Sequence, residues 1–169
     1  MKNVLFLALV SLSSWAAVYS TGPIRLQYDD SHWRIGAAHN DKGNAQSEVL
    51  VGLEEKESFE RYHSRFTVVA EDVSKFHTET PAGLKKYYRS VGEFLTNQRF
   101  QITNRKDTQL GGRAAYEITA NQRDFGLGYR QWVVVEGNKA YLMTASTRLS
   151  KFDEKAPALT AMAESFNLK

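Results

Sequence analysis

The sequence predicts an α+β fold, an α/β/α sandwich in which two helices cover the two faces of one antiparallel sheet. Apolar residues alternate with polar ones along several short segments, which is the pattern of strands with one buried side. Two other segments repeat apolar residues at spacings of three and four, as amphipathic helices do. Residues 132–135 are consecutively apolar, so this strand is predicted to be buried on both faces, and each face needs a cover.

The N-terminal segment has the layout of a secretory signal peptide. Lys2 supplies a positive start, residues 4–12 are almost wholly apolar, and residues 13–20 are mostly small and weakly polar. A helix needs about 20 apolar residues to cross a bilayer, and this run holds about half that number. We therefore expect the segment to be cleaved and not to anchor the protein in the membrane.

Two cleavage sites fit the preference for small residues at positions −3 and −1. One lies after Ala16 and the other after Ser20, and the second is preferred. The predicted organisation is a signal peptide over 1–20 and a single domain over 21–169, with a periplasmic or secreted location and no stable membrane insertion. No cysteine occurs, so the exported protein has neither a lipid-attachment thiol nor a disulfide.

The charge of the chain is modest and evenly spread. Lys and Arg number 22 against 19 Asp and Glu, which gives a formal net charge of +3. Both signs are interspersed along the chain, without the stripe of basic residues that nucleic-acid binding requires. We interpret the charges as a solvated surface and expect no nucleic-acid partner.

The first part of the mature chain is expected to form strands. Residues 24–28 and 33–38 are extended candidates, and the polar cluster at 40–44 marks a turn that suggests a hairpin. Each alternating set of apolar residues that follows should lie on one face of a sheet. These sets are Val49, Val51 and Leu53, and then Phe66, Val68 and Ala70.

The best-marked element is a helix over 81–97. Thr80 can cap its N-terminus, and Pro81 suits its first position. Gly83 and Gly92 are expected to weaken the helix by about 1 kcal/mol each relative to alanine. Its apolar residues recur at spacings of three and four: Leu84, Tyr87, Tyr88, Val91, Phe94 and Leu95.

From residue 100 onward the pattern is a meander of antiparallel strands. Gly137 and Asn138 form a tight-hairpin signal, because such turns need positive φ angles that these residues adopt easily. The expected strands are 100–106, 113–120, 127–136 and 139–147.

A second helical pattern near the C-terminus is expected to cover the other face of the sheet. Ser150 and Asp153 are spaced as a capping box. Pro157 fits the first turn of this helix, but it would kink a helix that began as early as Phe152. The apolar residues of the pattern are Leu159, Met162, Ala163 and Phe166.

The sequence contains no recognisable catalytic or metal-binding motif. The closest pair of histidines, His32 and His39, is seven residues apart, so in a regular strand the two would face opposite sides. No G-x-S-x-G, H-E-x-x-H, P-loop or G-x-G-x-x-G sequence occurs. We therefore predict no catalytic, cofactor-binding or metal-ligating residues and no enzymatic activity.

Aromatic residues are the remaining candidates for contact with a ligand or partner. Most of them recur with the period of the predicted elements, so packing in the core is their default role. The candidate contact residues are Trp33, Tyr87, Phe94 and Trp132.

The C-terminal part of the chain carries short motifs at turn and hydrophobic positions. They are residues 112–117 (Gly-Arg-Ala-Ala-Tyr-Glu), the strand with Tyr141, Thr144 and Ser146, and residues 164–166 (Glu-Ser-Phe). With the capped helix before them, these motifs resemble the PsbP and DcrB-like family, which shares its fold with the Mog-type Ran-binding import factor. The resemblance implies an α/β/α sandwich and a non-enzymatic, protein-binding role, and it transfers no functional residue.

Three functions follow, in order of preference. The first is an exported accessory protein that binds an unidentified protein of the cell envelope without catalysis. The second is a carrier of a small molecule or lipid in a pocket between helix and sheet, and the third is a periplasmic hydrolase. A bacterial periplasm is the expected setting, because no plant-type transit region precedes the domain.

Overall fold

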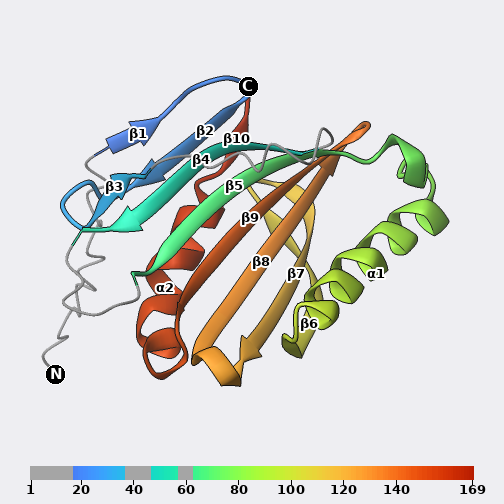
Figure 1. The fold of residues 1–169 in the computed structure, drawn as a ribbon. Coiled ribbons are helices and arrows are strands. Elements are labelled where there is room, and N and C mark those ends of the chain that lie inside the picture. The colour runs from blue at the N-terminus through green and yellow to red at the C-terminus, as the bar shows by residue number, and fades with distance from the viewer. Residues whose placement is uncertain (1–16, 37–46, 57–62) are drawn as a thin grey trace, which may run out of the picture.

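The computed structural model describes residues 17–36, 47–56 and 63–169, which form two antiparallel sheets and two α-helices (Figure 1). The strands of the large sheet are β3 (Trp33–Ile35), β4 (Ser47–Glu55), β5 (Arg65–Asp72), β6 (Gln101–Leu110), β7 (Arg113–Gln122), β8 (Leu127–Glu136) and β9 (Lys139–Arg148). They are ordered β3-β4-β5-β9-β8-β7-β6. The small sheet, ordered β1-β2-β10, contains β1 (Ala17–Tyr19), β2 (Ile24–Tyr28) and β10 (Asn167–Leu168).

The large sheet is the middle layer of the predicted sandwich. Helix α1 (Pro81–Asn97) lies on one face, and helix α2 (Phe152–Glu164) lies with the small sheet on the other (Figure 1). Strand β8 is buried on both faces, because Trp132 packs in the α2-side cluster and Val133 in the α1-side cluster. The sandwich is therefore confirmed, with a small sheet added to its α2 side.

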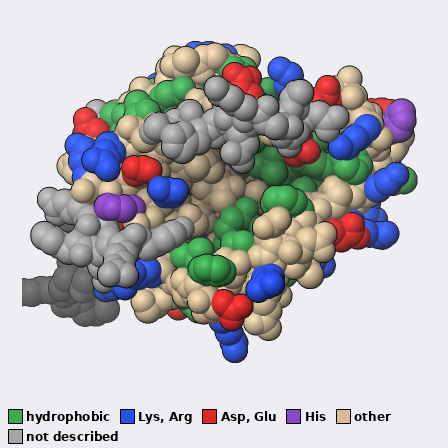
Figure 2. Space-filling view, in the orientation of Figure 1, with side chains coloured by type: hydrophobic (Ala, Val, Ile, Leu, Met, Phe, Trp, Pro, Cys, Tyr) green, Lys and Arg blue, Asp and Glu red, His purple; other side chains and the backbone are tan. Residues whose placement is uncertain are grey.

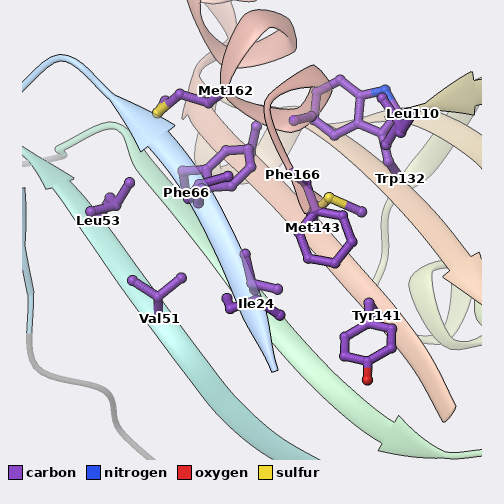
Figure 3. Packing of buried hydrophobic residues seen from close by; sticks show 14 of the residues in the cluster. Ile24, Val51, Leu53, Phe66, Leu110, Trp132, Tyr141, Met143, Met162 and Phe166 are labelled. Atoms are coloured by element: carbon purple, nitrogen blue, oxygen red, sulfur yellow. The ribbon is translucent and has the colours of Figure 1, made fainter. Parts of the chain in front are cut away.

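The larger hydrophobic cluster fills the space between the large sheet, the small sheet and α2. Figure 3 shows Phe66 of β5, Met143 of β9 and Phe166 meeting in this layer. Ile24 and Leu26 of β2 are fully buried there. Their burial explains why the small sheet is held against the large one.

Helix α1 has the predicted boundaries and the predicted cap. The backbone N–H of Gly83 donates to the Thr80 hydroxyl at 3.0 Å, and Pro81 occupies the first turn. The two glycines have a packing role as well as a helix-weakening one. A Cβ at Gly83 would lie 2.1 Å from the carbonyl oxygen of His77, and one at Gly92 would lie 2.8 Å from Nη2 of Arg105.

The sequence predicts that Val49, Val51 and Leu53 lie on one face of the sheet, and this prediction is wrong for Val49. Strand β4 has a register shift between Val49 and Val51. Val49 pairs with Val69 and Val51 pairs with Val68, and neighbouring residues of β5 point to opposite faces. The bulge therefore turns Val49 to the α1 side of the sheet.

The start of α2 also differs from the predicted capping box. A 3₁₀ turn over Leu149–Lys151 precedes the helix, Lys151 is its N-cap, and no side-chain hydrogen bond caps it. Pro157 consequently lies inside a helix that begins at Phe152. Phe166 is buried as expected, but it follows the helix and does not belong to it.

The first described strand falls inside the segment predicted to be a signal peptide. Ala17 pairs with Tyr28 and Tyr19 with Leu26, so β1 is a regular partner of β2. The hydroxyl of Tyr19 donates to the carbonyl oxygen of Leu50 at 2.7 Å. Residues 1–16, the turn cluster at 40–44 and His39 lie outside the described residues.

Strand β3 is shorter than the sequence indicates and ends at Ile35. It pairs antiparallel with β4, from Trp33 opposite Glu55 to Ile35 opposite Leu53. The four strands of the meander agree with the predicted ones to within a few residues and pair in the expected order. No helix within the described ranges is long and apolar enough to cross a membrane.

Candidate functional site

Helix α1 covers only part of its face of the sheet, and a groove of about 460 Å³ runs between the helix and the central strands. Seen from the α1 side, this face is hollowed, and hydrophobic side chains gather at the hollow (Figure 2). The groove takes its walls from α1 and its floor from β5, β8 and β9. Side chains lining it include Val69, Glu71, Tyr87, Phe94, Gln131 and Leu142.

The helix wall is built by residues one and two turns apart. Tyr87, Val91 and Phe94 occupy positions i, i+4 and i+7 of α1, so they share one face of the helix. Tyr87 and Val91 are buried against the sheet, whereas Phe94 leaves 61% of its surface exposed. A large aromatic side chain thus stands in solvent at the rim of the groove.

The groove contains a polar group without a partner. Nε2 of Gln131 donates to the hydroxyl of Thr144 at 3.0 Å, which fixes the amide against the sheet. Oε1 of the same amide is buried, and no described residue donates to it. Buried polar atoms in proteins are almost always paired, so this oxygen favours a hydrogen-bond donor from an occupant or from water.

The phenols around the groove are suited to donating hydrogen bonds and not to acting as bases. Burial, followed by the nearby Glu71 carboxylate, raises the pKa of Tyr87 far above its usual range, and its hydroxyl donates to Oε2 of Glu71 at 3.2 Å. Burial also raises the pKa of Tyr129, which packs against the α1-side cluster outside the groove lining, to about 12. Both groups therefore stay protonated in the neutral pH range.

The structure brings together two of the four predicted contact residues. Tyr87 and Phe94 line the same groove. Trp132 lies on the opposite face of the sheet, where its indole N–H donates to Oε2 of Glu117 at 3.0 Å, and Trp33 is buried in the α2-side cluster. Sequence reasoning missed Glu71 and Gln131, because their place in the groove depends on which strands lie beside α1.

A second hollow, of about 500 Å³, lies on the other side of α1, toward β6 and β7. The rings of Tyr88 and Tyr116 stack there with their centroids 4.5 Å apart and their planes 10° apart. Three cationic side chains surround the stack: Lys85, Arg89 and Arg105. This hollow is named the cationic groove below.

An exposed turn places a serine, a histidine and an aspartate in contact. Nδ1 of His32 lies 2.8 Å from both the Ser31 hydroxyl and Oδ2 of Asp29. In a hydrolytic triad the serine and the acid contact different ring nitrogens, so this arrangement lacks the geometry for proton relay. Hydrogen bonds from Ser31 and His32 lower the pKa of Asp29 to about 2, which is typical of a carboxylate that stabilises a turn.

The described part of the chain offers no obvious metal site. It contains no group of three or more His, Asp or Glu side chains that could together hold an ion. Most polar side chains lining the groove beside α1 are neutral donors and acceptors, and Glu71 and Lys75 are its two charged residues. This composition fits recognition of a ligand or a side chain.

No protein-family model matches the sequence, and no curated protein is significantly similar to it. Solved structures do resemble the fold. The chain aligns with the solution structure of cyanobacterial PsbP (CyanoP) from Synechocystis sp. PCC 6803 with a TM-score of 0.63 and 14% identity, over 90% of this chain and 92% of that one. The chain has the PsbP-like fold.

A second PsbP-like neighbour is PA94 from Pseudomonas aeruginosa, described as a protein of unknown function and putative regulator. It aligns with a TM-score of 0.55 and 18% identity, over 79% of this chain and 95% of that one. The family resemblance drawn from the sequence motifs is thus confirmed at the level of the fold. At such low identity the PsbP-like fold assigns no residue a function.

Proposed function

We propose that the protein is an exported, non-enzymatic accessory protein of the cell envelope that holds a protein partner in the groove beside α1. The observation that carries the proposal is Phe94, an aromatic side chain exposed at the rim of an apolar groove. Large aromatic residues beside a pocket are the usual energetic centres of protein interfaces. The PsbP-like fold agrees with an accessory role.

Site-specific photocrosslinking in the native envelope tests this proposal. A photoreactive amino acid at position 94 should yield a crosslinked complex with one protein species, because the side chain points into the interface. Position 125 is the matched control, since Phe125 is 69% exposed but lies away from the groove. Recovery of monomer alone from position 94, or equal crosslinking from both positions, would contradict the proposal.

A second function, carriage of a small molecule, is favoured by the size and chemistry of the same groove. Its volume of about 460 Å³ is within the range of ligand pockets. The unpaired Oε1 of Gln131 would accept a hydrogen bond from a hydroxyl or amide group of the ligand. Native mass spectrometry of protein purified from its own host should then show a bound mass, and a clean apo mass would exclude a tightly held ligand.

Export itself leads to a prediction about processing. We propose that the signal peptide ends at Ala16 and not at Ser20, the site that the sequence alone favours. Cleavage after Ser20 would remove β1, which pairs with β2 and whose Tyr19 hydroxyl bonds to Leu50. Cleavage after Ala16 leaves the whole strand in the mature domain. The intact mass of the exported protein should correspond to a chain beginning at Ala17, and a chain beginning at Thr21 would show the proposal wrong.

A further inference from the structure

We propose that the outer edge of β6 and the cationic groove beside it bind an extended acidic segment of a partner protein as an added strand. The inference rests on the proposed function in that it assumes a protein partner. It concerns the opposite side of α1 from Phe94, so the two surfaces can be tested separately.

Strand β6 is an open edge. It is the last strand of the large sheet and is ten residues long, and only Leu110 at its end is buried. In any strand about half of the backbone N–H and C=O groups point to each side, so the outer groups of β6 have no strand among the described residues to pair with. The ladder that β6 forms with β7 on its other side shifts register once, between Ile102 and Asn104. A long edge of this kind is a template for β-strand addition by an extended peptide.

The charges beside the edge favour an acidic occupant. Lys85 and Arg89 of α1 and Arg105 of β6 converge on the cationic groove, and Asp107 is its single lining acid. None of these three cations forms an ion pair with a described residue. Carboxylates of an added strand would therefore meet unpaired positive charge.

The same charges argue against a second copy of this chain as the occupant. Pairing of β6 with β6 would bring Arg105 and Lys106 of one copy near the same residues of the other, and like charges on adjacent strands repel. Charged residues on edge strands commonly prevent self-association in this way. The positive charges of β6 that repel a second copy of this chain attract an acidic strand.

The position of Arg105 is supported by the helix. A Cβ at position 92 would lie 2.8 Å from Nη2 of Arg105, so the absence of a side chain at Gly92 lets the guanidinium lie against α1. The side chain of Arg105 thus reaches from the edge strand β6 to helix α1. The stacked rings of Tyr88 and Tyr116 form an apolar wall of the same groove on the inner side of β6, toward β7.

The test uses a fluorescent peptide as long as β6 in which glutamate alternates with valine, because alternate residues of a strand face the same side. It is added to the full mature protein at about 0.15 M salt, where charges more than about 8 Å apart are largely screened. Binding should shift the backbone NMR signals of β6 and of the α1 residues that face it. Arg105→Glu should weaken binding by about tenfold or more, equivalent to losing a close charge pair.

Two controls separate strand addition from general attraction. Lys86→Glu changes the net charge by the same amount as Arg105→Glu, at a position of α1 outside the groove lining, and it should alter affinity by less than about twofold at this salt concentration. The same peptide with its backbone amides N-methylated keeps its charge but cannot pair with an edge, and it should not bind. Equal binding of the methylated peptide, equal effects of Lys86→Glu and Arg105→Glu, or no shift at β6 up to about 1 mM peptide would each overturn the inference.

These outcomes are independent of the crosslinking experiment. A Phe94-dependent crosslink without peptide binding at β6 would remove the strand-addition inference and leave the proposed function intact. Peptide binding at β6 without any crosslink from position 94 would instead remove the groove beside α1 as the partner site.

Discussion

Replacing Gly83 with alanine is expected to destabilise the domain by about 3 kcal/mol, although the same change in an ordinary helix is stabilising. The new Cβ would lie 2.1 Å from the carbonyl oxygen of His77 and 2.3 Å from that of Phe76. Both are backbone atoms, and the His77 carbonyl also accepts hydrogen bonds from the backbone N–H and the hydroxyl of Thr80. The helix therefore cannot accept the methyl group without disturbing its own N-terminal cap.

Gly92→Ala is the matched control, because it makes the same change in the same helix. The nearest atom to its Cβ is the end of the flexible Arg105 side chain, which can move aside. Alanine also favours the helix by about 1 kcal/mol, so the net change in unfolding free energy should be smaller than about 1 kcal/mol. Urea unfolding followed by tryptophan fluorescence measures both variants, and equal destabilisation by the two would contradict the clash at Gly83.

Helix α1 illustrates what the sequence alone could predict. Thr80, Pro81 and the apolar spacing act within a few residues of one another, so the helix boundaries follow from local chemistry. The shared face of Tyr87 and Phe94 is local in the same sense, since it depends only on helical geometry. One wall of the groove could therefore be anticipated.

The features that were missed depend on contacts between distant segments. The bulge at Val49 is defined only against β5, and β1 becomes a strand only because β2 pairs with it. Glu71 and Gln131 enter the groove because β9 lies between β5 and β8, an order that alternation along the chain does not encode. The apolar character of Trp132 gave no indication of which face of the sheet it occupies. Trp132 lies on the α2 side and Phe94 on the α1 side, so the sheet separates the two side chains.

The second large effect is expected at Glu117, a carboxylate buried on the α2 side of the sheet. It accepts the indole N–H of Trp132 at 3.0 Å and lies 3.5 Å from Nζ of Lys106 and 3.7 Å from Nε of Arg130. Arg130 in turn donates to the Thr160 hydroxyl at 2.9 Å and lies over the Trp132 ring. The Glu117 carboxylate of β7 thus contacts β6 and β8, and Arg130 extends the network to α2.

Removing this carboxylate leaves the partly buried Arg130 cation without its ion-pair partner and the indole N–H of Trp132 without its acceptor. Breaking a buried pair by deleting one member costs about 3–5 kcal/mol, and because Arg130 keeps some contact with water we expect Glu117→Ala to destabilise the domain by about 3 kcal/mol. Glu117→Gln keeps an acceptor for Trp132 but loses the charge, so a smaller loss is expected, about half as large.

Glu136→Ala is the control for an exposed ion pair. Glu136 lies 3.6 Å from Nε of Arg113 and is largely exposed, so its removal should cost less than about 1 kcal/mol. Urea unfolding should therefore rank Glu117→Ala as most destabilised, then Glu117→Gln, then Glu136→Ala. If Glu117→Ala were no worse than Glu136→Ala, the buried carboxylate would add nothing to the apolar packing on the α2 side, and Trp132 would owe its position to that packing alone.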